Sequence, residues 1–221
     1  MCEFKSGIVL RDEKEKGGFK LLMSPWTESH SELCQIFKIK DGARLSFARV
    51  EFSPPTMETA HLVDGYKLRI DDERTPEWFT DEIKDRVAEK MKAYVKSIIV
   101  TGDVDLLIGG QFIIAPGAKV SCAKAMVINA ICGGTVSVIC GGTVSVICGG
   151  TVSAIWGGTV SVICGGTVSA ICGGTVSAIC GGTVSEIRGG TVSVICGGTV
   201  SEIRKHFSGI IGKIHKAAKV T

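Results

Sequence analysis

Cysteine is the residue type whose number and spacing most invite chemistry in this chain. Eight of the ten cysteines lie at Cys122 or beyond, and most recur at the last position of an eight-residue repeat. Zinc prefers a closed tetrahedral set of ligands, and no His or Asp accompanies these repeated thiols. A disulfide framework is typical of secreted chains, but no signal peptide is visible before the first charges. We therefore predict small, reduced, apolar side chains, with no metal and no cofactor.

A second candidate chemistry is nucleophilic catalysis near the N-terminus. Cys2 resembles in position the nucleophile of amidotransferases that use an N-terminal cysteine, and His30 could act as a base for Cys2 or Cys34. Met1 precedes Cys2, so the Cys2 amine is not free, and the residues that flank the nucleophile in those enzymes are missing. A single histidine at a helix N-terminus is more often a surface group. The sequence predicts no catalytic residue, no small-molecule substrate and no enzyme.

Charge is distributed unevenly along the chain. Residues 1–100 carry 17 basic and 18 acidic residues, residues 101–204 carry four of each, and residues 205–221 carry four lysines and no acid. A nearly neutral body with a short basic tail is not typical of nucleic-acid binding. No charge occurs from Ala125 to Ser185, but Gly, Thr and Ser interrupt every octad, which excludes a spanning helix. We expect a cytosolic protein with no membrane partner.

An eight-residue phrase, G-G-T-V-S-x-I-z, occurs nine times from Gly133 to Arg204, and only x and z vary. Looser copies extend the register back to Thr101, which makes thirteen octads. Paired glycines with Val, Thr and Ile are poor in helices and favour strands and tight turns. Short periodic β sequences of this kind build solenoids. The layout resembles the repeats of calcium β-rolls, but the octad has no Asp, so calcium binding is not expected.

The variable positions x and z indicate how many octads form one coil. Counted from Gly133, the even-numbered copies have only Val, Ala and Cys there, whereas the odd-numbered copies hold Trp156 and every charge. Taking every third copy mixes the two classes. We therefore predict a two-sided parallel β-solenoid with about 16 residues per coil, six and a half coils in 101–204 and a length of roughly 31 Å.

The two sets of copies predict two different walls. The even set forms an uncharged strip, a typical contact surface for a second copy of the chain in a homodimer or for another protein. Its residues are Val146, Cys148, Val162, Cys164, Ala178, Cys180, Val194 and Cys196. The alternative is that these cysteines lie under a neighbouring loop. The odd set ends in an exposed ion ladder, which stabilises little but marks a solvated wall. Its residues are Glu186, Arg188, Glu202 and Arg204.

The invariant apolar positions predict the inside of the coil. Because Glu and Arg at x and z must point outward, Ile at position 7 points inward. Strict alternation would place Val at position 4 outside, so we predict a bend near Ser at position 5 that returns the valine to the core. The glycine pair then forms the corner, where a positive φ is needed.

Both ends of the solenoid are predicted to be covered by helices, because open strand edges need caps. Thr75-Pro76 is expected to open a helix over about 76–96, which with the first strand makes a connecting segment, 76–100. Residues 205–221 place Phe207, Ile210, Ile211, Ile214 and Ala218 on one side of a short basic helix. A basic anchor for a membrane or nucleic acid is the alternative for this segment, but four lysines are too few to favour it.

Residues 1–75 predict a small α+β domain. Strands are expected at 2–10, 19–24, 47–52 and 66–70, and Ser29 opens a helix through Phe37 with a capping box. The four parts of the chain are thus 1–75, 76–100, the solenoid 101–204 and the tail 205–221.

Three motifs of the first 100 residues resemble small, uncharacterised proteins of bacteriophages and prophages. They are Met-Cys-Glu-Phe-x-Ser-Gly at the start, Ser-His-Ser at 29–31 and Thr-Pro-Glu-Trp-Phe at 75–79. In some of those proteins a short N-terminal domain precedes a repeat region. The resemblance implies a viral setting in the cytosol of a host cell, but no activity and no catalytic residue.

These observations together predict a non-enzymatic, phage-type interaction protein that self-associates and binds a host protein, with inhibition of a host defence system as one outcome. A structural virion or fibre component is one alternative, although so many reduced cysteines argue against it. Ice binding is another, since Thr-x-Ser rows resemble the Thr-x-Thr arrays of ice-binding solenoids. Mimicry of DNA, as in pentapeptide-repeat inhibitors of topoisomerases, ranks last because the nine copies hold only two Glu.

Overall fold

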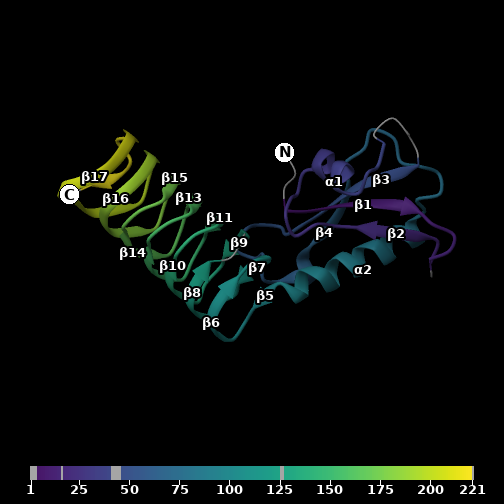
Figure 1. The fold of residues 1–221 in the computed structure, drawn as a ribbon, viewed down its shortest axis with the longest axis horizontal. Coiled ribbons are helices and arrows are strands. Elements are labelled where there is room, and N and C mark those ends of the chain that lie inside the picture. The colour runs from purple at the N-terminus through teal and green to yellow at the C-terminus, as the bar shows by residue number, and fades with distance from the viewer. Residues whose placement is uncertain (1–3, 16, 41–45, 125–126, 221) are drawn as a thin grey trace. The chain divides into compact units, whose positions relative to one another are not determined.

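The computed structural model describes residues 4–220 except 16, 41–45 and 125–126, and it leaves the side chains of 205–208 undescribed. The chain divides into two compact units, Met1–Ser97 and Ile98–Thr221 (Figure 1). The first unit is a small α+β structure and the second is a parallel β-solenoid.

The first unit contains a four-stranded antiparallel sheet with the order β2-β1-β3-β4. Its strands are β1 (Lys5–Arg11), β2 (Phe19–Leu22), β3 (Phe47–Ser53) and β4 (Lys67–Ile70). All four expected strands are therefore confirmed within a few residues. One face of the sheet packs against α1 (His30–Ile36), with Ile8, Leu33 and Phe47 among the buried contacts.

Of the two helices of the first unit, α1 begins where the sequence predicted and α2 begins later. Ser29 caps α1, and its side chain accepts a hydrogen bond from the Glu32 amide. The second helix, α2 (Asp81–Ser97), buries Val87, Met91 and Val95, which recur every four residues along one face. It begins later than expected, because the Phe79 amide bonds to the Pro76 carbonyl in a separate turn. A short 3₁₀ turn, η1 (Val63–Gly65), precedes β4.

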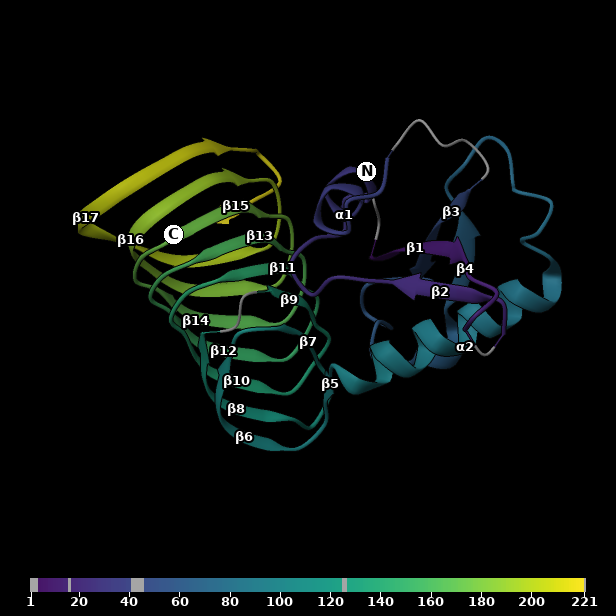
Figure 2. The ribbon, with the colours of Figure 1, turned by 45° about the vertical axis from the view of Figure 1, so that its right-hand side comes forward.

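The second unit has two rows of parallel strands that alternate along the chain (Figure 2). The even row, which holds the even-numbered octads, contains β5 (Ile99–Val100), β7 (Gln111–Ile114), β9 (Val127–Ile131), β11 (Thr143–Ile147), β13 (Thr159–Ile163) and β15 (Thr175–Ile179). The odd row contains β6 (Asp103–Ile108), β8 (Lys119–Lys124), β10 (Thr135–Ile139), β12 (Thr151–Ile155) and β14 (Thr167–Ile171). The two rows meet at β16 (Thr183–Ile195), which spans one octad of each.

Strand pairing confirms two octads per coil. Thr135 of β10 lies beside Thr151 of β12, and Thr143 of β11 lies beside Thr159 of β13, so each residue pairs with its counterpart 16 positions later. The hydrogen-bond ladder continues into the corners, where the Thr151 amide donates to the Gly134 carbonyl. We call the outer surfaces of the two rows the even wall and the odd wall.

The core consists of the two invariant apolar columns. All nine valines at position 4, and all isoleucines at position 7 except Ile203, are at most 1% exposed. In β10 the inward residues Val136 and Ile139 are three positions apart, and the exposed Ser137 lies between them. The strand therefore bends after the serine, as predicted, which is how both columns enter one core.

The two glycines of the octad are constrained for different reasons. The second glycine has φ between +71° and +86° in every copy, a region that side chains rarely adopt. The first glycine passes close to the coil before it in most copies, as at Gly165, where a Cβ would lie 2.0 Å from the Cys148 carbonyl oxygen, but not at Gly141. The corners thus set how closely the coils stack.

The C-terminal segment is not a helix, and the prediction of a helical cap there is wrong. β17 (Thr199–Ile214) continues from the last perfect octad, and its second part pairs with β16, Ile210 beside Thr191 and Ile214 beside Ile195. Residues 208–215 therefore form a further octad after a three-residue insertion at 205–207. β18 (Lys219–Val220) then begins another coil beside Thr199 and Val200. The role of α2 as a cap for the other end stays a prediction.

Among the described residues, no helix is both long and apolar enough to cross a bilayer.

Candidate functional site

The even wall carries the residues predicted to make contacts, and the structure brings them into columns. Val146 lies beside Val162, Val162 beside Ala178, and Ala178 beside Val194. The valine and alanine members are less exposed than expected: Val146 is buried, and Val162, Ala178 and Val194 are intermediate. The cysteines at position z follow the same stacking, and Cys164 and Cys180 are exposed. The exposed part of the strip therefore consists mainly of thiols.

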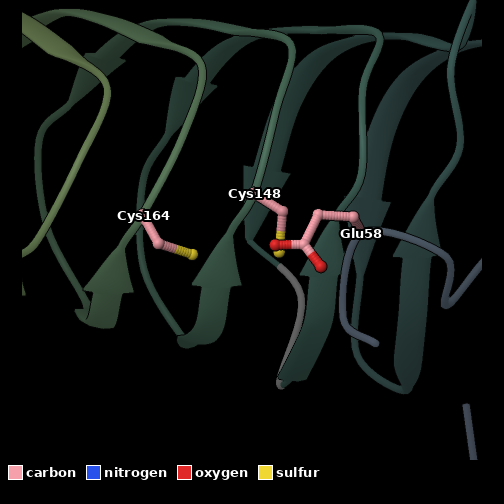
Figure 3. A group of neighbouring side chains, drawn as sticks. All are labelled: Glu58, Cys148 and Cys164. Carbon is pink, nitrogen blue, oxygen red and sulfur yellow. The ribbon is translucent and has the colours of Figure 1, made fainter. Parts of the chain in front are cut away.

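The thiols of the even wall lie close to one another on successive coils. Figure 3 shows Cys148 and Cys164 next to neighbouring strands, and their sulfur atoms lie within 4.8 Å of each other. The sulfurs of Cys180 and Cys196 are 2.7 Å apart and share a hydrogen bond. Cys164 and Cys196 also donate to the carbonyls of Ile147 and Ile179. The cysteines of the even wall are therefore accessible to solvent, and some of them also make hydrogen bonds to the preceding coil.

Proximity to another thiol raises the pKa of one cysteine on each wall, Cys180 and Cys140. The hydrogen bond with Cys196, partial burial and the neighbouring thiols raise the pKa of Cys180 to about 11. On the odd wall, Cys122 and Cys140 are 3.0 Å apart, and this hydrogen bond is the main cause that raises the pKa of Cys140. Thiols with raised pKa values are poor nucleophiles at neutral pH, which makes a catalytic role for them unattractive.

One member of the even column was missed in the sequence. Ile131 pairs with Ile147, which places Cys132 directly before Cys148 in the stack. The octad AMVINAIC, residues 125–132, lacks the glycine pair, but its last two letters match the repeat and could have identified this cysteine. The column therefore contains five thiols on consecutive coils, and they are Cys132, Cys148, Cys164, Cys180 and Cys196.

Within the nine perfect octads, the odd wall carries the charges, as predicted. Glu186 and Glu202 lie beside each other on adjacent coils. Arg188 Nε lies 2.6 Å from Glu186 Oε2, and Arg204 pairs with the other oxygen of the same carboxylate. Partial burial raises the pKa of Glu186, but the hydrogen bonds from the two arginines outweigh it and hold the pKa below its ordinary value. Trp156 is 67% exposed on this wall and interrupts its cysteine column.

His30 is buried rather than a surface group, which corrects that interpretation. Its Nδ1 lies 3.0 Å from Asp71 Oδ2, and its Nε2 lies 3.1 Å from the Val50 carbonyl. Glu51 completes a group of possible metal ligands, but it is 2.5 Å from the Arg69 guanidinium. Because both ring nitrogens and the buried carboxylate are engaged, the cluster connects α1 to the sheet and does not suit a metal. Cys34 is buried in the same unit, and Cys2 lies outside the described residues.

Lys5 is a fully buried cation that the sequence did not single out. Its Nζ donates to the Ser24 carbonyl at 2.6 Å, lies 2.9 Å from Glu28 Oε1 and faces the Tyr94 ring at 5.0 Å. Burial lowers the pKa of Lys5, although Glu28 opposes this effect. A lysine with a lowered pKa can act as a nucleophile, but this one is 0% exposed and cannot meet a substrate. It joins β1, the 24–28 loop and α2.

A shallow hollow in the first unit is lined by Arg11, Arg74, Thr75, Glu77 and Trp78. These lining residues include no cysteine or histidine. Comparison with protein-family models, with curated proteins and with solved structures finds no match to this chain. The bacteriophage resemblance therefore stays an expectation.

Proposed function

We propose that the chain is a non-enzymatic interaction protein whose even wall binds the even wall of a second copy. The observation that carries the proposal is the absence of charge across the four perfect even octads of this wall, beyond which Lys213 lies beside Val194. At the outward positions of the four perfect even octads, 141–148, 157–164, 173–180 and 189–196, every side chain is Thr, Ser, Val, Ala or Cys.

Such a wall suits self-association for physical reasons. Extended, uncharged surfaces with apolar content are uncommon on monomers and often mark contact sites. A two-fold contact places identical patches against each other, so that like charges would repel. The perfect even octads carry no charged side chain and avoid this repulsion. The odd wall differs, because Glu186, Arg188, Glu202 and Arg204 would have to be desolvated.

Glutamate at position x tests the proposal without disturbing the fold, because Glu186 and Glu202 occupy this position naturally. Ala178→Glu places the charge on the even wall, and the matched control Ala154→Glu places it on the odd wall. We expect the unaltered chain and the control to be dimeric, and Ala178→Glu to be monomeric, in sedimentation velocity. A monomeric unaltered chain at high concentration, or equal behaviour of both variants, would overturn the proposal.

The viral setting extends this proposal to a host protein as partner. Capture from a host lysate with the unaltered chain and with Ala178→Glu as baits tests the extension. We expect a host protein that the unaltered chain retains and the variant loses. Equal capture by both baits would contradict binding through the even wall.

Ice binding is the second candidate, and one observation favours it. The hydroxyl residues at positions 3 and 5 face outward together, since Thr135, Ser137, Thr151 and Ser153 are exposed while Val136 and Val152 are buried. These rows repeat at about 4.8 Å between coils and about 6.6 Å along a strand. A thermal hysteresis measurement on the full chain checks this candidate, and a freezing point equal to the melting point would eliminate it.

A further inference from the structure

The five-thiol column of the even wall has a spacing that matches a specific kind of ligand. Its members lie on consecutive coils, and neighbouring strands are about 4.8 Å apart. Bonds from a metal to thiolate sulfur are about 2.3 Å long, so a metal placed in line between two thiolates spans about 4.6 Å. A linear S–metal–S unit therefore fits between adjacent coils with little movement of the backbone.

The side chains can reach this arrangement. The sulfurs of Cys180 and Cys196 lean toward each other at 2.7 Å, whereas those of Cys148 and Cys164 lie within 4.8 Å. The coils fix the separation of the Cα atoms. Rotation about one Cα–Cβ bond is therefore enough to change the distance between two neighbouring sulfurs from the shorter to the longer value. Cys164 and Cys180 are exposed, so an ion in solution has access to the middle of the column.

The chemistry of the column selects among metals. Thiolate ligands favour soft cations such as Cu(I). Zinc needs a closed tetrahedral set, which thiols arranged in a line do not provide. Monovalent ions that accept two ligands in line, Cu(I) and Ag(I), meet both conditions.

We propose that the cysteine column of the even wall binds monovalent thiophilic cations, Cu(I) or Ag(I), each between the thiolates of two adjacent coils. In each site two thiols lose their protons, two metal–sulfur bonds form, and two protons leave to solvent, so that no electron transfer is involved. Because each site forms only when two thiols lose their protons, binding weakens as pH falls. The proposal does not rest on self-association.

The test is a titration of the reduced full chain with Cu(I) in the absence of oxygen, in competition with a coloured Cu(I) chelator, with native mass spectrometry to count the ions. The column variant is Cys148→Ser/Cys164→Ser/Cys180→Ser. The control is Cys172→Ser, which removes a thiol of the odd wall whose neighbours in the stack are Trp156 and Arg188 rather than cysteines. Position z tolerates such changes, because Trp156, Arg188 and Arg204 occupy it naturally, and circular dichroism confirms that both variants fold.

We expect at least two ions per unaltered chain, retention of these ions by the control, and binding at least about tenfold weaker in the column variant. The same stoichiometry in the column variant, or an equal loss in both variants, would overturn the proposal. The Ala178→Glu variant keeps every thiol and should bind as many Cu(I) ions as the unaltered chain. Its Cu(I) titration therefore tests the metal site independently of dimerisation.

Discussion

Lys5 in the first unit and Ile163 in the solenoid are both completely buried, but they are held in opposite ways. Lys5 depends on one carbonyl and one carboxylate from the 24–28 loop and on one ring from α2. Ile163 meets the same kind of residue in the coil before it and the coil after it, Ile147 and Ile179. The first unit thus relies on contacts that occur once, and the solenoid on contacts that recur.

The largest expected effect breaks a contact that occurs once. Glu28→Gln keeps the shape of the side chain but leaves the buried Lys5 ammonium without its counter-charge. We expect the free energy of unfolding of the first unit to fall by about 4 kcal/mol, as for other broken buried pairs. Urea unfolding followed by tryptophan fluorescence, in a Trp156→Phe background that leaves Trp26 and Trp78, measures this unit. Glu13→Gln, at a solvated pair with Arg11, is the control and should change little.

The next effect tests whether the corners set the stacking. Gly165→Ala places a Cβ 2.0 Å from the Cys148 carbonyl oxygen, whereas the nearest atom to a Cβ on Gly141 is Lys124 Cγ at 3.8 Å. We expect Gly165→Ala to lower the free energy of unfolding by about 3 kcal/mol and Gly141→Ala by less than about 1 kcal/mol. Thermal unfolding followed by circular dichroism compares them. Similar losses at both glycines would show that the close approach to the preceding coil is not the reason why glycine occupies the first position of the octad.

A smaller effect tests whether the coils are equivalent. Ile147→Val, Ile163→Val and Ile179→Val each remove one buried methylene from the same column. We expect each to cost about 1 kcal/mol, with differences below about 0.5 kcal/mol, because each site has the same neighbours. Chemical unfolding of the three variants provides the values. A clear gradient along the column would contradict the picture of independent, equivalent coils.

The smallest effect concerns the ion ladder. The pKa of Glu186 lies below its ordinary value of 4.5, so its contribution to stability is complete above about pH 4.5 and is lost as pH falls through the lower folded value. The pair is solvated and salt screens it. Glu186→Gln should therefore differ slightly from the unaltered chain at pH 7 in low salt, and the difference should shrink as pH falls below 4.5 and in high salt. A difference that changes with neither pH nor salt would assign the stability to packing rather than charge.

Much of the solenoid was predictable from the repeat, because the same local signal occurs nine times. The alternation of x and z predicted 16 residues per coil, and the invariant Val and Ile predicted both core columns, which the pairing of Thr135 with Thr151 and the burial of Val136 and Ile139 confirm. The segment 205–221 was misinterpreted because Ile211 and Ile214 are three apart, a spacing common to a helix and to positions 4 and 7 of the octad. The open edge of β16 decides between them by offering backbone partners.

The candidate sites were less predictable. The even-wall columns followed from the repeat, but Cys132 lies in an octad without the glycine pair and was missed. His30 looked like a surface group because the residues that bury it, Val50 and Asp71, are distant in sequence. The burial of Lys5 could not be predicted from the local sequence, because its partners Glu28 and Tyr94 come from separate segments.

The sequence by itself determined the period, the two walls and the inward columns of the solenoid, because each coil touches only its copies and every local preference is repeated. Only the tertiary structure decided which way the C-terminal segment folds, how His30 and Lys5 are enclosed, and how near the thiols of successive coils approach. Those outcomes depend on backbone edges and side chains brought together from distant parts of the chain, where a local pattern carries no information.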